Sequence, residues 1–85
     1  MLTLIITDHQ FNPSPLRLSQ AEGQVQVVNK SHKAKRIVSD TPGQFDSGTL
    51  APETSTIMAV PTSQCVYQYH EATDQHLKGQ LNIGT

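Results

Sequence analysis

Short runs of alternating apolar and polar residues recur along the chain, with turn residues between them. Leu4 and Ile6 share one parity in the first run, and Val25 and Val27 do so in a later one. Because successive side chains of a strand point to opposite faces, each run predicts a β-strand with one buried face. No long stretch has a helical period. The expected strands cover residues 2–7, 16–18, 25–29, 37–38, 54–60, 66–69 and 78–85.

The spacing of these runs indicates how they assemble. Turn residues recur roughly every 8–12 residues, which is typical of a sandwich or a Greek-key barrel. Pro13 and Pro15 cannot both lie inside a paired strand, so residues 8–15 are expected to form a bend. A short helical turn is allowed between residues 41 and 53. We therefore predict an all-β fold, a Greek-key β-sandwich of about seven strands.

Length and charge limit the possible functions. The 85 residues form a single domain, 1–85, in which 35% of residues are apolar and only 15% are charged. The net charge of −1 gives no support to nucleic-acid binding. No segment is apolar enough for membrane insertion, and the N-terminus lacks the pattern of a signal peptide. We expect a monomer.

Two local features stand apart from this background. Four of the six basic residues lie in one window, residues 30–36, which is either a solvated loop or a docking patch for an acidic partner. Cys65 is the one cysteine, so a disulfide framework is excluded. It is expected at a strand start.

Five motifs follow one another in a particular order. Phe11-Asn12-Pro13 comes first, and residues 23–29 then form a strand that ends in Asn29. Residues 45–52 read FDSGTLAP, residues 67–69 read YQY, and residues 77–83, LKGQLNI, follow near the C-terminus. This series resembles the cupredoxins, in particular the plastocyanin and amicyanin type, over nearly the whole chain. The resemblance implies a Greek-key β-sandwich and an extracytoplasmic, periplasmic location.

The same resemblance implies where copper ligands would lie. The first histidine position is occupied by Lys35, or by Arg36 if the match slips by one residue. The cysteine position is occupied by Glu71, the second histidine position by Asp74 and the methionine position by Leu77. A blue-copper site needs a thiolate, two imidazoles and a weak axial ligand, and these side chains do not supply that set. Cys65 is expected at the far end of the sandwich from Glu71, because a strand separates them.

Three hypotheses for this end of the molecule remain open. In the first, Lys35 pairs with Glu71 or Asp74 and closes the loops as a metal would. In the second, a metal such as copper(II), zinc or iron binds a non-standard set of imidazoles and carboxylates. In the third, the domain is an interaction module. The metal candidates are His32, Glu71, Asp74 and His76, whereas the partner-docking candidates are Lys30, Lys33 and Arg36.

The main functional prediction is a copper-free, non-catalytic binding module without a cofactor, whose partner is an unidentified protein. A metal-binding protein related to copper electron-transfer proteins is the alternative. An enzyme is not expected, because Glu71 and Asp74 are the only acid–base candidates and no nucleophile lies beside them. Asn29 is expected to be a simple turn residue or to hydrogen-bond across the adjacent loop, and Tyr67 and Tyr69 are expected in the core.

Overall fold

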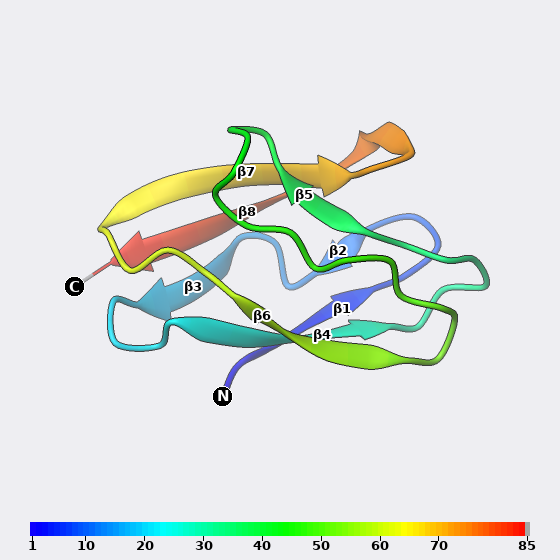
Figure 1. The fold of residues 1–85 in the computed structure, drawn as a ribbon, viewed down its shortest axis with the longest axis horizontal. Helices are drawn as coiled ribbons and strands as arrows, with labels where there is room; N and C mark the ends of the chain where they lie inside the picture. The colour runs from blue at the N-terminus through cyan, green and yellow to red at the C-terminus, as the bar shows by residue number, and fades with distance from the viewer. Residues whose placement is uncertain (85) are drawn as a thin grey trace.

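Two four-stranded sheets face each other in the computed structural model, which describes residues 1–84 (Figure 1). The strands are β1 (Thr3–Ile6), β2 (Phe11–Asn12), β3 (Leu16–Ser19), β4 (Gln24–Asn29), β5 (Ile37–Ser39), β6 (Ser55–Ala59), β7 (Cys65–Glu71) and β8 (Asp74–Gly84). The first sheet has the order β2-β1-β4-β6, and the second has the order β3-β8-β7-β5. The predicted all-β sandwich is confirmed.

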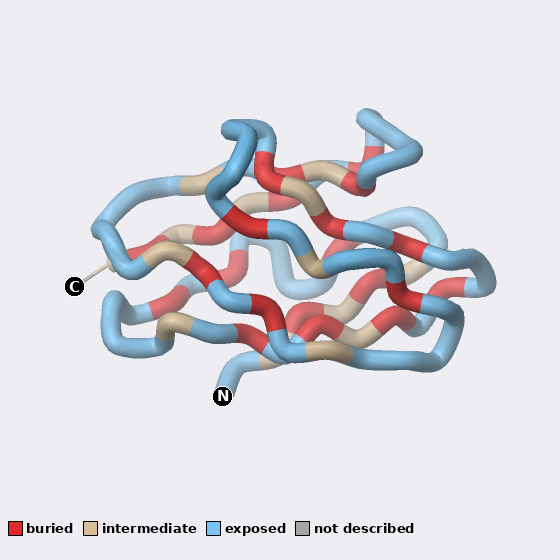
Figure 2. Tube along the Cα trace, viewed as in Figure 1, coloured by how far each residue is buried: buried red, intermediate tan, exposed pale blue. Residues whose placement is uncertain are grey.

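The alternation seen in the sequence determines which side chains form the core. Leu4 and Ile6 of β1 and Val25 and Val27 of β4 are fully buried, while the residues between them are more exposed. Figure 2 shows the same alternation as short buried stretches along most strands. The inner faces of both sheets therefore form one shared apolar layer.

An aromatic cluster fills the middle of this layer. Tyr69 of β7 is completely buried, and its ring meets Phe11 edge-on with ring centroids 4.8 Å apart and Phe45 with centroids 6.1 Å apart. Tyr67 is only partly buried and packs against the same cluster. On β8, Gly79 lies directly opposite Tyr69 in the sheet register, where the Tyr69 ring occupies the space that a side chain would need.

The sheets combine parallel and antiparallel pairs. β1 runs parallel to β4, and β3 runs parallel to β8, whereas β7 and β8 form an antiparallel hairpin. The chain therefore crosses from one sheet to the other several times instead of completing one sheet before starting the next.

Several details differ from the sequence-based expectations. Residues 1–84 contain eight strands and not seven, because residues 11–12 pair with β1 inside the segment expected to be only a bend. Leu2 lies outside β1 and is 38% exposed. β8 begins at Asp74, so the expected loop after Glu71 is reduced to a tight turn. Residues 41–53 contain turns but no helix. The last residue of the expected strand 78–85 lies outside the described residues.

No helix in residues 1–84 has the length and apolar character needed to cross a membrane.

Candidate functional site: the loop end of the sandwich

Four connections meet at one end of the sandwich, on the right in Figure 1. They are the β1–β2 loop, the β4–β5 loop, the segment leading into β6 and the β7–β8 turn. Hydrogen bonds join the β4–β5 loop to each of the others, through His32 to Asp8, Arg36 to Glu71 and Lys35 to Leu50. This is the end at which the substituted ligand positions were expected.

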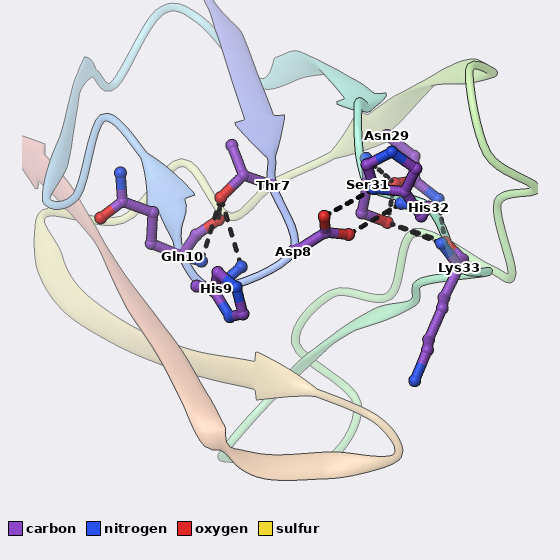
Figure 3. Close-up of polar contacts among 8 residues, drawn as sticks. All are labelled: Thr7, Asp8, His9, Gln10, Asn29, Ser31, His32 and Lys33. Atoms are coloured by element: carbon purple, nitrogen blue, oxygen red, sulfur yellow. Dashed lines mark hydrogen bonds and ion pairs between the residues drawn. The ribbon is translucent and has the colours of Figure 1, made fainter.

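Asn29, the last residue of β4, organises the loop that follows it. Its amide Nδ2 donates to the carbonyls of Lys33 and Leu50, each at 2.9 Å. Its Oδ1 accepts from the backbone N–H of Ser31 at 2.9 Å and from the Ser31 hydroxyl at 2.6 Å. Asn29 is completely buried, so these bonds satisfy groups that water does not reach. Of the two expectations for Asn29, the bridge across the loop is the one found (Figure 3).

An aspartate–histidine pair fastens the β1–β2 loop to the β4–β5 loop (Figure 3). Asp8 Oδ1 accepts the backbone N–H of His32 at 2.8 Å, and Asp8 Oδ2 lies 2.7 Å from His32 Nδ1. The hydrogen bond and charge of Asp8 raise the pKa of His32, and the backbone and side-chain bonds from His32 lower the pKa of Asp8. Both side chains face solvent, so the pair positions the loops more than it stabilises the fold.

We expect the pKa of His32 to fall when Asp8 is replaced by asparagine, because the carboxylate that favours imidazolium is lost. In the wild type the raised pKa means that the ionic link persists up to about pH 6.5 and disappears as the pH rises through the His32 pKa. In acid the link is lost again as the pH falls through the lowered pKa of Asp8. An NMR titration of the imidazole protons measures this. His70 is the internal control, because its partner is Asp40 and the substitution leaves that pair in place. An unchanged His32 pKa in Asp8→Asn contradicts the assignment.

Glu71 is the buried carboxylate at the end of β7, with 2% of its surface exposed. Its Oε2 accepts the backbone N–H of Arg36 at 2.8 Å, and its Oε1 accepts the N–H of Thr73 at 2.9 Å as well as the Thr73 hydroxyl. Burial by itself raises the pKa of Glu71, but the bonds from Thr73 and Arg36 and the charge of Lys35 outweigh it and leave the pKa below its usual value. Both carboxylate oxygens of Glu71 therefore already accept hydrogen bonds from other residues of the chain.

The other three expected ligand positions have different environments. Lys35 is 8% exposed and its backbone forms a bridge with Leu50, while Leu77 is buried in the core. Asp74 is exposed and its Oδ1 accepts the backbone N–H of His76 at 2.9 Å. Within residues 1–84 no carboxylate lies within 4.0 Å of the Lys35 ammonium, so the expected close ion pair with Glu71 or Asp74 is not formed. The Glu71 carboxylate accepts hydrogen bonds from backbone N–H groups instead of pairing with the Lys35 ammonium.

A hollow of about 340 Å³ opens at this end of the sandwich. Its walls bring together two lysines, two carboxylates and two imidazoles from separate loops: Lys33, Lys35, Asp8, Asp74, His9 and His32. Asp8 is already paired with His32. The remaining charged side chains of the hollow are the two lysines and Asp74.

The metal alternative required His32, Glu71, Asp74 and His76 to converge. In the described part of the chain, no three His, Cys, Asp or Glu side chains are grouped in a way that would hold a metal ion. His32 is bound to Asp8 instead. His70 points away from buried Glu71, as the parity of β7 requires, and its Nδ1 lies 2.7 Å from Asp40 Oδ1.

The basic loop is partly neutralised by acidic neighbours. Arg36 forms a two-pronged contact with Asp46, in which Nε lies 2.9 Å from Oδ1. Lys30 lies 3.8 Å from Glu53. Among residues 1–84, no acidic group lies within 4.0 Å of the Lys33 ammonium. Of the three expected docking residues, Lys33 therefore has the most available charge.

Sequence reasoning missed the residues that hold this end together. Asp8 was assigned only to a bend, and Asp46 and Thr73 were not singled out. An aspartate after a strand end or before a turn glycine often accepts loop N–H groups, and this signal was present at Asp8, which follows β1, and at Asp46, which accepts the Gly48 N–H. Their partners lie far away in the sequence and follow only from the fold. Cys65 lies opposite Ile83, at the other end of β7 from Glu71, as expected.

The geometry described above defines a cupredoxin-like β-sandwich, and comparison with solved structures shows the same fold. The chain is similar to a novel purple cupredoxin from Nitrosopumilus maritimus, with a TM-score of 0.82 and 16% identity over 99% of this chain and 100% of that one. It is also similar to an oxidized mutant of amicyanin, with a TM-score of 0.79 and 14% identity over 96% of this chain and 80% of that one.

The chain is also similar to a reduced mutant of amicyanin, with a TM-score of 0.79 and 12% identity over 96% of this chain and 80% of that one. No protein-family model matches the sequence, and no curated protein matches it. At these identities the likeness shows the fold, and the predicted resemblance to cupredoxins is confirmed at that level.

Proposed function

We propose that this chain is a copper-free cupredoxin-like domain that works as a non-catalytic binding module for an acidic protein partner. The observation that carries the proposal is the environment of Glu71. This carboxylate occupies the position expected for the thiolate ligand, and both of its oxygens are bonded to Arg36 and Thr73. The loops that a metal ion would join are joined here by the protein's own hydrogen bonds.

The charges around the hollow indicate the kind of partner. Lys33 and Lys35 line it from the β4–β5 loop, and Lys30 lies earlier in the same loop. The link between Arg36 and Asp46 steadies the far end of that loop. A carboxylate presented by a partner meets the exposed charge of Lys33, which has no acidic side chain within 4.0 Å among residues 1–84, and this favours steered and salt-sensitive association.

The metal-binding alternative is less well supported, because two of its four candidate ligands, Glu71 and His32, already bond to other residues. Glu71 accepts from Arg36 and Thr73, and His32 is held by Asp8. Titration of the protein with copper(II) and zinc(II), followed by NMR of the histidine rings, distinguishes a copper-free binding module from a metal-binding protein. Tight one-to-one binding that shifts His32, His76 and the Glu71–Asp74 turn supports the alternative and contradicts the copper-free domain.

The docking proposal is tested with a short oligoglutamate peptide as the probe. Amide shifts measured by NMR are expected to concentrate in residues 30–36 and 72–76 and to weaken as salt is raised to about 0.5 M. Lys33→Glu is expected to weaken binding at least about tenfold, which corresponds to ~1.4 kcal/mol. Lys78→Glu is the matched control, because Lys78 is an exposed lysine outside the hollow. Equal loss in both variants, or shifts scattered over the surface, contradicts the proposal.

A further inference from the structure

Within the described residues 1–84, β6 is an edge strand whose outer backbone groups have no hydrogen-bond partner. It pairs only with β4, at the margin of the first sheet (Figure 1). The Asn29 N–H donates to the Thr54 carbonyl and the Val60 N–H to the Gly23 carbonyl, so the even-numbered residues of this strand direct their backbone groups toward β4. The N–H and C=O groups of the odd-numbered residues, Ser55, Ile57 and Ala59, therefore point outward.

β4 gives an independent check of this parity. The N–H of Gln26 donates to Leu2 and that of Lys30 to Ile6, so the even-numbered residues of β4 bond to β1 and the odd-numbered ones to β6. Within residues 1–84 no other hydrogen bond reaches the outer groups of Ser55, Ile57 or Ala59. All three residues are exposed.

This edge lacks the features that usually prevent sheet-to-sheet pairing. Residues 54–60 contain no charged residue and no proline. Ile57, at the centre of the strand, is 56% exposed on the outer face of the sheet. The free edge ends sharply on both sides, at Glu53, which has a left-handed φ of 64°, and at Pro61, which has no N–H. A partner therefore fits along only about five residues.

We propose that two copies of this chain associate through β6, in an antiparallel pairing centred on Ile57. The spacing of the free groups is self-complementary. With Ile57 opposite its own copy, Ser55 of each chain lies opposite Ala59 of the other, and all outward N–H and C=O groups form ladder bonds. The two exposed Ile57 side chains become neighbours on one face, and the two first sheets form one continuous sheet of eight strands.

This interface lies along the margin of the sheet and uses none of the residues that line the hollow. It therefore leaves the proposed docking site open in both copies. The contact is small, which places it among weak interfaces below about 1,200 Å². We expect half of the protein to be dimeric at a concentration on the order of 100 µM.

Analytical ultracentrifugation of the whole chain over a concentration series is the first test. The average mass is expected to rise toward twice the monomer mass as the protein approaches about 1 mM. Ile57→Lys places two like charges opposite each other and is expected to keep the protein monomeric. Val66→Lys is the matched control, because Val66 is a 54% exposed residue of the other sheet. A wild type that stays monomeric at 1 mM, or an Ile57→Lys variant that still dimerises, overturns the proposal.

A cross-link tests the register. In a Cys65→Ser background, Ile57→Cys brings two thiols to directly opposed positions about 5.5 Å apart at Cα, which suits a disulfide. Ala59→Cys is the control, since the register shifts its two copies roughly 13 Å along the strand. We expect a covalent dimer from the first variant under mild oxidation and monomer from the second. Equally fast cross-linking of both variants overturns the proposed register.

Discussion

Replacing Gly79 by alanine is expected to destabilise the fold by about 3 kcal/mol or more, because the new methyl group has no space. A Cβ at this position would collide with Oη and Cζ of Tyr69 and lie 2.7 Å from its Cε1. The Tyr69 ring cannot move aside easily, since it is completely buried between Phe11 and Phe45. For a domain of this size the loss corresponds to a fall in melting temperature of roughly 10–20 °C, measurable by circular dichroism.

Two further variants test whether the loss of stability comes from the collision with Tyr69 or from any substitution of a glycine in β8. Gly84→Ala is in the same strand, but a Cβ there meets nothing within 4 Å, so its stability is expected to change by less than about 0.5 kcal/mol. Combining Gly79→Ala with Tyr69→Ala removes the obstructing ring, and the double variant is expected to lose less than the sum of the two single losses. Additive losses contradict the proposed contact.

Replacing Glu71 by alanine is expected to cost about 2–4 kcal/mol in the free energy of unfolding at neutral pH. The change leaves the backbone N–H groups of Arg36 and Thr73 without their carboxylate acceptor at the loop end of the sandwich. Urea unfolding measures the loss, and hydrogen exchange is expected to accelerate at the amides of Arg36 and Thr73. Glu22→Ala, at an exposed turn, removes the same charge and is expected to have little effect.

The Glu71 contribution also has a defined pH dependence. Because the folded-state pKa of Glu71 lies below its usual value, the ionised carboxylate stabilises the fold fully above about pH 4.5. This stabilisation is lost as the pH falls through the folded-state pKa. The stability difference between wild type and Glu71→Ala is therefore expected to shrink in acid. A difference that stays constant down to pH 2 contradicts the assignment of these bonds to the charged form.

The parts of the fold that follow from local alternation were predictable. Val25 and Val27 lie inside the sandwich because one parity of a strand faces the core, and Leu81 and Ile83 obey the same rule at the C-terminus. The order of the cupredoxin-like motifs then indicated how the strands assemble. Tyr69 was expected in the core and is completely buried there.

The loop end was predicted only in part, because its contacts join residues far apart in the sequence. The resemblance placed Lys35 and Glu71 at the same end of the sandwich. Their opposite charges were the only basis for expecting an ion pair between them. The structure gives Glu71 three nearer donors, two of them within the tight turn at Thr73, which the sequence did not reveal as a turn. The link between Asp8 and His32 spans two loops and depends on their docking. Strand pairing at residues 11–12 was missed because two prolines follow closely.

The parallel pairing of β3 with β8 has a consequence for how the chain reaches this structure. Leu16 lies beside Leu81, and β8 is also the strand that connects β3 to β7. Within the second sheet β3 therefore has no pairing partner until β8 has been synthesised. Contacts between such distant segments carry a large loop-closure cost, which slows folding in all-β proteins. We expect the nascent domain to remain largely unfolded on the ribosome and to fold in one late, cooperative step after β8 emerges.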